Sequence, residues 1–327
     1  MSAKPHHPFR FAVQAFDATS GKEWFEIARR TEGFGYSTLF TTDHYFGPGS
    51  IASTSGHRPV DVAPIAAMTA AAGVTNVLRV GCRVFNVDLH HPVVLAKELA
   101  TLDMLSDGRL EVGLGAGWVA AEYEGLGVTM DSPGTRIERL GEVVDVLKAH
   151  WSGLDLELDG TYFHASGFAG RPNPVQKPHP PIFIGGGRPR ILRLAGRLAD
   201  VVSVNFDNSA GKLGSSSVAT SGAEQTEQKL QWVREGAGDR FEQIELEIGA
   251  YFVSVSDEPQ DALTAMATRF GVDEAEFATH PHALIGTVDS ICDTLHERRD
   301  RFGLSYVTVP QRNMDEFAPV VARLTGG

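Results

Sequence analysis

Cysteines and long apolar runs are scarce in this chain. Only Cys82 and Cys292 occur among 327 residues, and they lie too far apart to suggest a disulfide framework. So few cysteines fit a reducing compartment, and we therefore expect a cytoplasmic protein. No run of about 18 apolar residues is present to cross a bilayer. The first ten residues, MSAKPHHPFR, lack the apolar centre of a signal peptide, so we expect no membrane partner.

Positive charge and the common nucleotide-binding motifs are scarce too. Lys and Arg total 29 against 41 Asp and Glu, which gives a net charge of −12 at pH 7. An acidic surface repels phosphate backbones, so we expect no nucleic-acid partner and a small-molecule substrate instead. A nucleophile elbow, a Walker loop and a dinucleotide-binding fingerprint are all missing. His90-His91 suggests a metal only superficially, because no third ligand follows at a suitable spacing.

What the chain does contain is a regular alternation of strand and helix patterns. The strand-like segments are residues 9–16, 37–42, 77–82, 110–114, 182–184, 200–204, 244–255 and 304–309. Such alternation requires a parallel sheet, and eight repeats favour an α/β fold of the closed (β/α)8 type over an open sheet. With 42% hydrophobic residues the chain can bury a large core, and we expect residues 1–327 to form a single domain.

Two connections are longer than a barrel needs, and we expect insertions after the fourth and sixth strands. The first insertion contains Asp159-Gly160, a strong signal for a two-residue hairpin turn. The second, residues 208–222, is rich in Gly and Ser, has little to bury and is expected to be mobile.

Some conspicuous side chains have ordinary explanations. Trp24 and Trp151 lie on apolar helical stripes, which places them in the core. His280 and His282 belong to a proline-containing loop and are expected to be solvated, although they could face the mouth of a site.

In a parallel barrel the active site lies at the carboxyl ends of the strands, and this rule selects four stretches. Asp43-His44 follows the second strand, and histidine suits proton or hydride chemistry near neutral pH. On residue type alone a loop histidine, with Asp43 as a helix cap, is the better explanation. Residues 82–86 are the end of the third strand, and residues 113–118 form a glycine loop in which the backbone can approach a neighbour closely.

The fourth stretch is Gly185-Gly186-Gly187-Arg188, between the fifth strand and its helix. Exposed amides at a helix N-terminus bind anions, glycines let a phosphate come close, and Arg188 could add charge. The alternative is a left-handed turn without a ligand.

Four segments resemble the bacterial-luciferase-like flavin and deazaflavin oxidoreductases. They are HPVVLAKELATLDMLSDGRLEVGLGAGW at 91–118, GTYF at 160–163, PHPPIFIGGG at 178–187 and LIGTVDSICDTL at 284–295. The resemblance is densest to a subgroup that uses coenzyme F420. It implies a luciferase-type barrel that transfers a hydride between F420 and a small organic substrate, and it implies a homodimer. An FMN-dependent monooxygenase and a non-catalytic cofactor-binding protein are the alternatives.

The resemblance also implies roles for particular residues. Asp43 and His44 would lie beside the cofactor ring and be catalytic. The ring and its phosphate tail would be held by Arg83, Val84, Phe85, Asn86, Gly115, Ala116, Gly117, Trp118, Gly185, Gly186, Gly187 and Arg188. The family often has a non-proline cis peptide at the bulge, which we place at Arg83-Val84. Residues 208–222 would act as a lid.

One position departs from the related glucose-6-phosphate dehydrogenases. Trp118 stands where they carry a catalytic glutamate, which argues against that substrate. Glu122 is the nearest carboxylate and resembles a glutamate common in the wider family, but a structural or helix-surface role explains it equally well.

Overall fold

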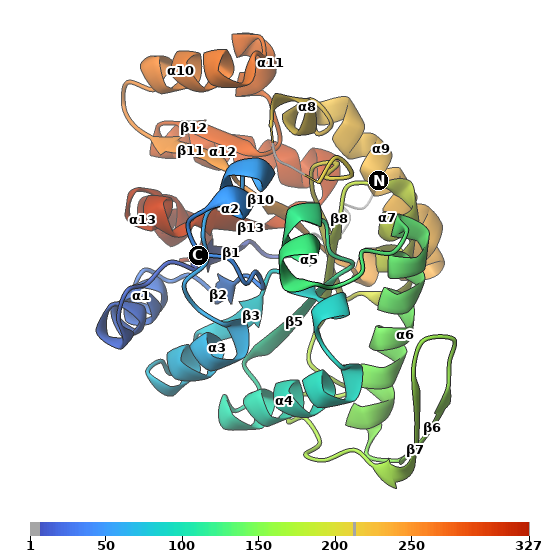
Figure 1. Cartoon of the computed structure of the whole chain (residues 1–327). Coiled ribbons are helices and arrows are strands. Elements are labelled where there is room, and N and C mark those ends of the chain that lie inside the picture. The colour runs from blue at the N-terminus through green and yellow to red at the C-terminus, as the bar shows by residue number, and fades with distance from the viewer. Residues whose placement is uncertain (1–6, 212–213, 327) are drawn as a thin grey trace.

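The computed structural model describes residues 7–211 and 214–326, and eight parallel strands form its centre (Figure 1). These strands are β1 (Arg10–Gln14), β2 (Thr38–Thr41), β3 (Arg79–Cys82), β5 (Leu110–Gly115), β8 (Ile182–Gly186), β9 (Val201–Val204), β10 (Glu245–Gly249) and β13 (Leu304–Pro310). Pairing of β1 with β13 and of β3 with β5 closes the sheet. The short β4 (Phe85–Asn86) continues β3 and also pairs with β5. The predicted (β/α)8 barrel is confirmed.

A helix follows each barrel strand and covers the outside of the sheet (Figure 1). These helices are α1 (Gly21–Gly33), α3 (Pro64–Gly73), α4 (Pro92–Leu105), α6 (Pro133–Ser152), α7 (Pro189–Leu198), α9 (Ala223–Ala237), α12 (Val288–Phe302) and α13 (Met314–Thr325). Proline at the first turn of α3, α4, α6 and α7 suits helix entry, because that turn has no use for the missing N–H. Three short 3₁₀ turns span Val87–Leu89, Gly238–Gln243 and Gln311–Asn313.

The main core lies between the strands and the helices, and a smaller cluster fills the barrel itself. Inside the barrel, Phe40 packs against Phe183 and Tyr306 at ring-centroid distances of 5.6 and 6.0 Å. Trp24 and Trp151 are buried, as predicted, and each indole N–H donates to a carbonyl on a neighbouring helix, that of Ala67 or Ala96.

A buried ion-pair network closes the amino end of the barrel. Glu111 on β5 is 1% exposed and accepts hydrogen bonds from Arg10 and Arg79, both at 2.7 Å. The Tyr306 hydroxyl donates to its other oxygen at 3.1 Å. Burial alone would raise the pKa of Glu111, but the two guanidinium groups lower it below its ordinary value. A ligand therefore has to approach from the carboxyl end.

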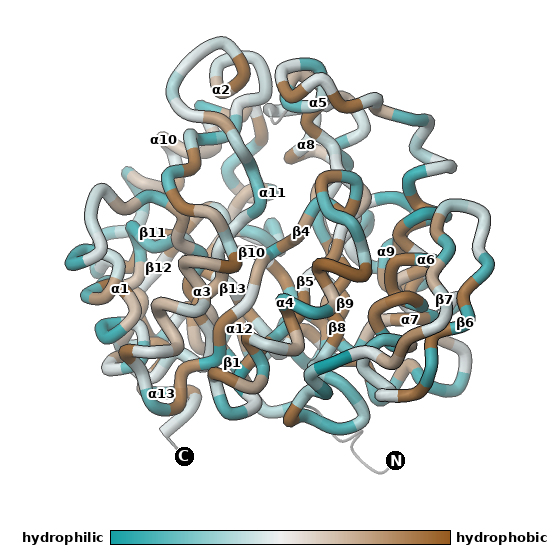
Figure 2. The backbone as a smooth tube through the Cα atoms, turned by 60° about the horizontal axis from the view of Figure 1, so that its bottom comes forward, coloured by the Kyte–Doolittle hydropathy of each residue, from teal (hydrophilic) through white to brown (hydrophobic). Residues whose placement is uncertain are grey.

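Three short helices that periodicity did not predict lie together at one end of the molecule (Figure 2). They are α2 (Ser50–Ser55), α5 (Ala120–Leu126) and α8 (Ser215–Val218). Each belongs to a connection that leaves the carboxyl end of a barrel strand, so this is the end at which a site is expected. They are too short for a clear helical period in the sequence.

The prediction of a single seventh strand over residues 244–255 is wrong in the second half of that range. β10 ends at Gly249, and β11 (Phe252–Val255) pairs instead with β12 (Ala283–Gly286) in a separate two-stranded sheet. The excursion also carries α10 (Gln260–Phe270) and α11 (Glu274–Ala278). The backbone changes partner within three residues, since Ala250 N–H bonds Thr308 O and Phe252 N–H bonds His282 O. The apolar pattern runs on through this change and cannot reveal it.

The insertion after the fourth strand contains the predicted hairpin, formed by β6 (Asp155–Asp159) and β7 (His164–Ala169). Its connection has four residues rather than the predicted two. Glu142 on α6 explains the difference, because its carboxylate accepts the N–H groups of Thr161, Tyr162 and Phe163. The turn is shaped by a distant side chain, which a local dipeptide signal does not register.

The insertion after the sixth strand buries more than its composition suggested. Within 208–222, Ser217, Val218 and Ser221 are buried, so the prediction that it has little to bury is wrong there. Residues 212 and 213 of that segment lie outside the described residues. The predicted solvated loop at His280 and His282 is also wrong, since both side chains are buried.

Within residues 7–211 and 214–326, no helix is both long and apolar enough to cross a bilayer.

Candidate active site

The sequence candidates gather where the connections leave the carboxyl ends of neighbouring strands. Asp43-His44 follows β2, residues 83–86 follow β3, and residues 116–118 follow β5. Residues 187–188 follow β8. The parallel order of the strands therefore brings segments far apart in sequence to one end of the barrel (Figure 1).

Asp43 ties the end of β2 to the bulge after β3. Asp43 is 1% exposed, and Oδ2 accepts hydrogen bonds from the Asn86 N–H at 2.9 Å and from His90 Nε2 at 2.8 Å. Oδ1 is buried without a hydrogen bond of normal geometry among the described residues, and the Tyr45 hydroxyl is the neighbouring group that interacts with this carboxylate. Asp43 caps no described helix, so the helix-cap explanation is wrong, and His90 serves this carboxylate.

His44 is held by Glu122, which comes from α5. His44 Nδ1 lies 2.7 Å from Glu122 Oε2, and the Tyr45 N–H donates to Oε1 at 2.6 Å. An ionised carboxylate only accepts, so Nδ1 carries the proton and Nε2 is left with a lone pair in the neutral ring. No described residue bonds Nε2. Glu122 is 2% exposed, which excludes the helix-surface role.

Aromatic side chains surround the His44 ring. Its centroid lies 4.4 Å from that of His57, 5.5 Å from Phe46 and 6.0 Å from Trp118, which meets it edge-on. Burial, and secondarily the neighbouring His44, lowers the pKa of His57 to about 4, so this imidazole is uncharged at neutral pH. The sequence analysis missed His57, and its only signal was a histidine within a connection rich in Gly and Ser.

The peptide between Arg83 and Val84 is cis, as the family resemblance implied. The Arg83 side chain crosses the barrel mouth, where Nε donates to Glu247 on β10 at 3.0 Å. Its other nitrogens donate to Ser203 Oγ and to the Tyr251 hydroxyl, both at 3.2 Å. Arg83 is therefore a buried, neutralised cation rather than a free anion site.

The glycines of residues 113–117 make room for protein, and packing alone accounts for them. A Cβ on Gly113 would overlap the Cys82 carbonyl oxygen, and one on Gly115 would lie 2.5 Å from Val84 Cγ2. Gly117 has a φ of +68°, and a Cβ there would overlap the Tyr123 hydroxyl. The close approach predicted for this loop is thus made to the 82–84 bulge and to α5.

The glycine run after the fifth barrel strand is explained in a similar way. Gly185 and Gly186 end β8, and none of the three glycines has a positive φ, so the left-handed turn is wrong. A Cβ on Gly187 would overlap the Phe206 carbonyl oxygen. Arg188 is 63% exposed on its side chain and pairs with Asp207 at 2.8 Å.

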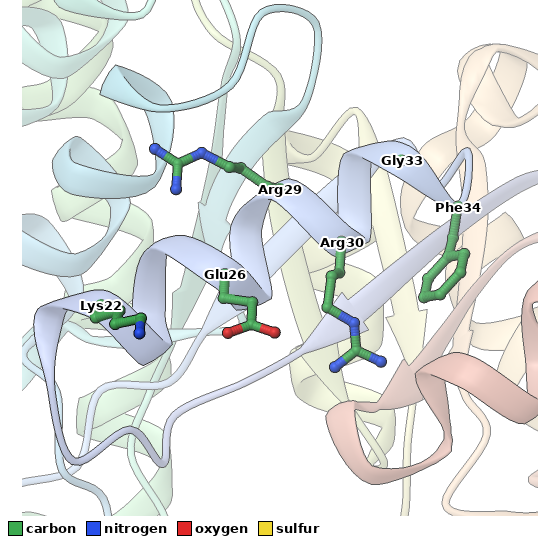
Figure 3. A pocket seen from close by; sticks show the side chains of 6 residues that line it. All are labelled: Lys22, Glu26, Arg29, Arg30, Gly33 and Phe34. Atoms are coloured by element: carbon green, nitrogen blue, oxygen red, sulfur yellow. The ribbon is translucent and has the colours of Figure 1, made fainter.

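Within 7–211 and 214–326, no group of three or more His, Cys, Asp or Glu side chains is placed to hold a metal ion. A surface hollow runs along α1 and is lined by Lys22, Glu26, Arg29, Arg30, Gly33 and Phe34 (Figure 3). It contains none of the candidate site residues.

Several proteins are similar to this chain in sequence. An uncharacterized protein of Mycobacterium tuberculosis is 32% identical over 203 residues, which cover 58% of this chain and 70% of that protein. An F420-dependent glucose-6-phosphate dehydrogenase of Gordonia bronchialis is 28% identical over 80% of this chain and 71% of that protein. An FMNH2-dependent dimethylsulfone monooxygenase of Pseudomonas putida is 30% identical over 37% of this chain and 33% of that protein.

Solved structures share the fold at lower identity. The coenzyme F420-dependent tetrahydromethanopterin reductase of Methanopyrus kandleri superposes with a TM-score of 0.72 at 19% identity and covers 97% of both chains. The long-chain alkane monooxygenase LadA gives a TM-score of 0.76 at 16% identity, over 98% of this chain and 92% of that one. The model of the luciferase-like monooxygenase family matches residues 7–301. The chain therefore belongs to the luciferase-like monooxygenase family of oxidoreductases.

Proposed function

We propose that this protein transfers a hydride between coenzyme F420 and a small organic substrate at the carboxyl end of its barrel. The observation that carries the proposal is the His44–Glu122 pair, in which Glu122 holds Nδ1 at 2.7 Å and no described residue bonds Nε2. A histidine fixed in this way can take up or release a proton at Nε2 while a hydride moves elsewhere.

The residues present fit the ring of such a cofactor. Asp43 Oδ1 is a buried carboxylate oxygen without a hydrogen bond of normal geometry among the described residues, and a ligand that brings an N–H donor would satisfy it beside the Tyr45 hydroxyl. The pyrimidine part of both the deazaflavin and the flavin ring carries such an N–H. Val84, Phe85, Asn86 and Trp118 would supply backbone and aromatic surface around it.

Further contacts belong to the same proposal. Gly115, Ala116 and Gly117 would border the cofactor, and the phosphate tail would extend towards residues 185–188. The fit is weaker there, because Arg188 is paired with Asp207 and α7 begins with a proline that has no N–H to offer. Residues 208–222 would form a lid, and the whole chain would act as a single domain that assembles as a homodimer.

When bound, the deazaflavin supplies a ring carbon that gives or accepts a hydride. The protein supplies the proton chemistry. Neutral His44 accepts a substrate proton at Nε2, and protonated His44 returns one there. Glu122 holds the proton on Nδ1 and stabilises the positive charge by ion pairing, and Asp43 holds the 83–86 bulge in register with β2.

Two comparisons bear on the choice of cofactor. The Gordonia relative, which aligns over 80% of this chain, is F420-dependent, and this supports the deazaflavin. The monooxygenase of Pseudomonas putida uses reduced FMN and is 30% identical over a shorter stretch, so an FMN-dependent monooxygenase is the second candidate. Trp118, in place of the dehydrogenases' glutamate, speaks against glucose 6-phosphate as the substrate.

Parallel fluorescence titrations of the purified protein with F420 and with FMN test the proposal. Binding of F420 at low micromolar concentration, with FMN much weaker, is the expected result. A preference for FMN would favour the second candidate function, an FMN-dependent monooxygenase, and an oxygen-uptake assay would then test it. Binding of neither would remove the basis for both.

The catalytic assignment has its own test. His44→Ala should lower turnover by about 10²- to 10⁴-fold, the usual contribution of a general acid or base. Unchanged turnover in this variant, with the cofactor still bound, would show that His44 is not the proton-transfer group.

A further inference from the structure

His44 needs more than Glu122 to hold its plane. A single hydrogen bond at Nδ1 leaves an imidazole free to swing about that bond, and Nε2 moves with it. Among the rings around His44, that of His57 approaches most closely, with its centroid 4.4 Å away at an interplanar angle of 51°, against 5.5 Å for Phe46 and 6.0 Å for Trp118. His44 therefore lies between a carboxylate and a second imidazole.

His57 is itself fixed from several sides. Its Nδ1 donates to the Arg58 carbonyl oxygen at 2.7 Å, and its backbone N–H donates to Ser55 Oγ at 3.1 Å. The rings of Phe16, Phe46 and Trp118 lie around it at centroid distances of 5.6, 5.9 and 6.1 Å. Because both the backbone and the side chain of His57 are held, its ring can limit the movement of the neighbouring His44 ring.

The connection that carries His57 is also anchored to the barrel. The Val60 N–H donates to the Phe46 carbonyl, and the Asp61 N–H donates to the Phe16 carbonyl, so the chain after β2 closes on itself and on the end of β1. Arg58 extends outward and forms an ion pair with Asp17. This arrangement brings His57 back onto His44 across the 12 intervening residues.

We propose that His57 is a positioning residue, whose ring fixes the plane of the His44 imidazole so that Nε2 stays aimed at the reacting atoms. The proposal rests on the proposed function in one respect, the role of His44 Nε2. The uncharged state of His57 suits the positioning of His44. A charged His57 ring, 4.4 Å from the His44 ring, would compete for Glu122 and repel a protonated His44.

The test follows the ring nitrogens of His44 by ¹⁵N NMR in the cofactor-free protein. In the wild type the two nitrogens should have the widely separated shifts of a single, Nδ1-protonated tautomer. In His57→Ala the separation should fall to about half or less, because a ring that rotates away from Glu122 loses the hydrogen bond that keeps the proton on Nδ1 and then samples both tautomers. His57→Phe, which keeps a planar ring beside His44, should restore most of the separation.

Unchanged His44 shifts in His57→Ala would overturn the proposal, as would a Phe variant that behaves like the Ala variant. His164→Ala, on the exposed hairpin strand β7, is the matched control and should leave the His44 signals unchanged. His57→Leu replaces the Ala variant if circular dichroism shows that the latter does not fold. Because no cofactor is present, the result is independent of whether F420 or FMN binds.

Discussion

Glu122 and His44 are 78 residues apart in sequence, and their side chains meet at 2.7 Å across the mouth of the barrel. The contact joins α5 to the connection after β2. It gives the histidine one committed nitrogen and one nitrogen available to a ligand, which is the arrangement that proton transfer requires.

Glu122→Gln should lower turnover by at least about tenfold, because the amide cannot stabilise a charged imidazole beside it. The amide has nearly the same size, so the melting temperature should change little. Glu124→Gln, on the exposed side of the same helix, is the matched control. Equal rates for the two variants would refute a role for Glu122 in the chemistry.

Gly113→Ala should destabilise the protein by about 1–3 kcal/mol, the usual cost of overpacking. The added methyl group would overlap the backbone carbonyl of Cys82, which cannot yield without moving β3. Gly185→Ala is the control, because its nearest neighbour would be Ser203 Cβ at 3.5 Å. Urea unfolding measures both, and equal stabilities would mean that the 82–84 bulge is not rigid.

The Arg83–Glu247 ion pair should be costly to break one partner at a time. Arg83→Met or Glu247→Gln leaves one buried charge unpaired, which typically costs about 3–5 kcal/mol. The double variant should cost less than the two single variants together. In the exposed pair, Arg188→Ala should change stability by no more than about 1 kcal/mol. Additive costs in the buried pair would show that the two groups do not interact.

Acid should destabilise the protein partly through His280. Burial is the main reason that its pKa is lowered from 6.5 to about 4. The unfolded chain therefore binds the proton first, and this contribution to stability is complete above pH 6.5 and is lost as the pH falls towards 4. A shift of this size corresponds to something on the order of 3 kcal/mol.

Urea unfolding at pH 7.5 and pH 5.0 measures this effect of acid. His280→Gln keeps a donor for the Val218 carbonyl, and its loss of stability between the two pH values should be smaller than that of the wild type. His164→Ala, with its exposed ring, should lose as much as the wild type. The same loss in all three proteins would contradict the assignment to His280.

Lys229→Met should loosen the connection between β9 and α9. Lys229 is buried and donates to the Asn205 and Thr220 carbonyls at 2.6 and 2.8 Å and to Ser221 Oγ, so it fastens both ends of that connection. Cleavage within 208–222 by a dilute protease should accelerate about tenfold. Lys97→Met, on the surface of α4, is the control. Equal cleavage rates for the two variants would show that Lys229 does not anchor this connection. Protection of this segment by bound cofactor would support the lid.

The sequence was sufficient for the barrel because its strands and helices have strong, different periods. Asp43-His44 and the cis peptide at Arg83-Val84 came from the family resemblance rather than from the residues alone; the structure contains the cis peptide, and the role of Asp43-His44 stays a proposal. His57 and the buried state of Glu122 were missed, because both depend on how two irregular connections pack against each other. The change of partner after Gly249 was missed because apolar residues continue on both sides of it.

The ion-pair network of Glu111, Arg10 and Arg79 has a kinetic consequence. It closes one end of the barrel, and the packed rings of Phe40, Phe183 and Tyr306 fill the interior above it. In the proposed function, cofactor and substrate would then share a single entrance at the opposite end. Whichever of the two lies deeper has to arrive first and depart last, so the closed end of the barrel imposes an order on binding and release.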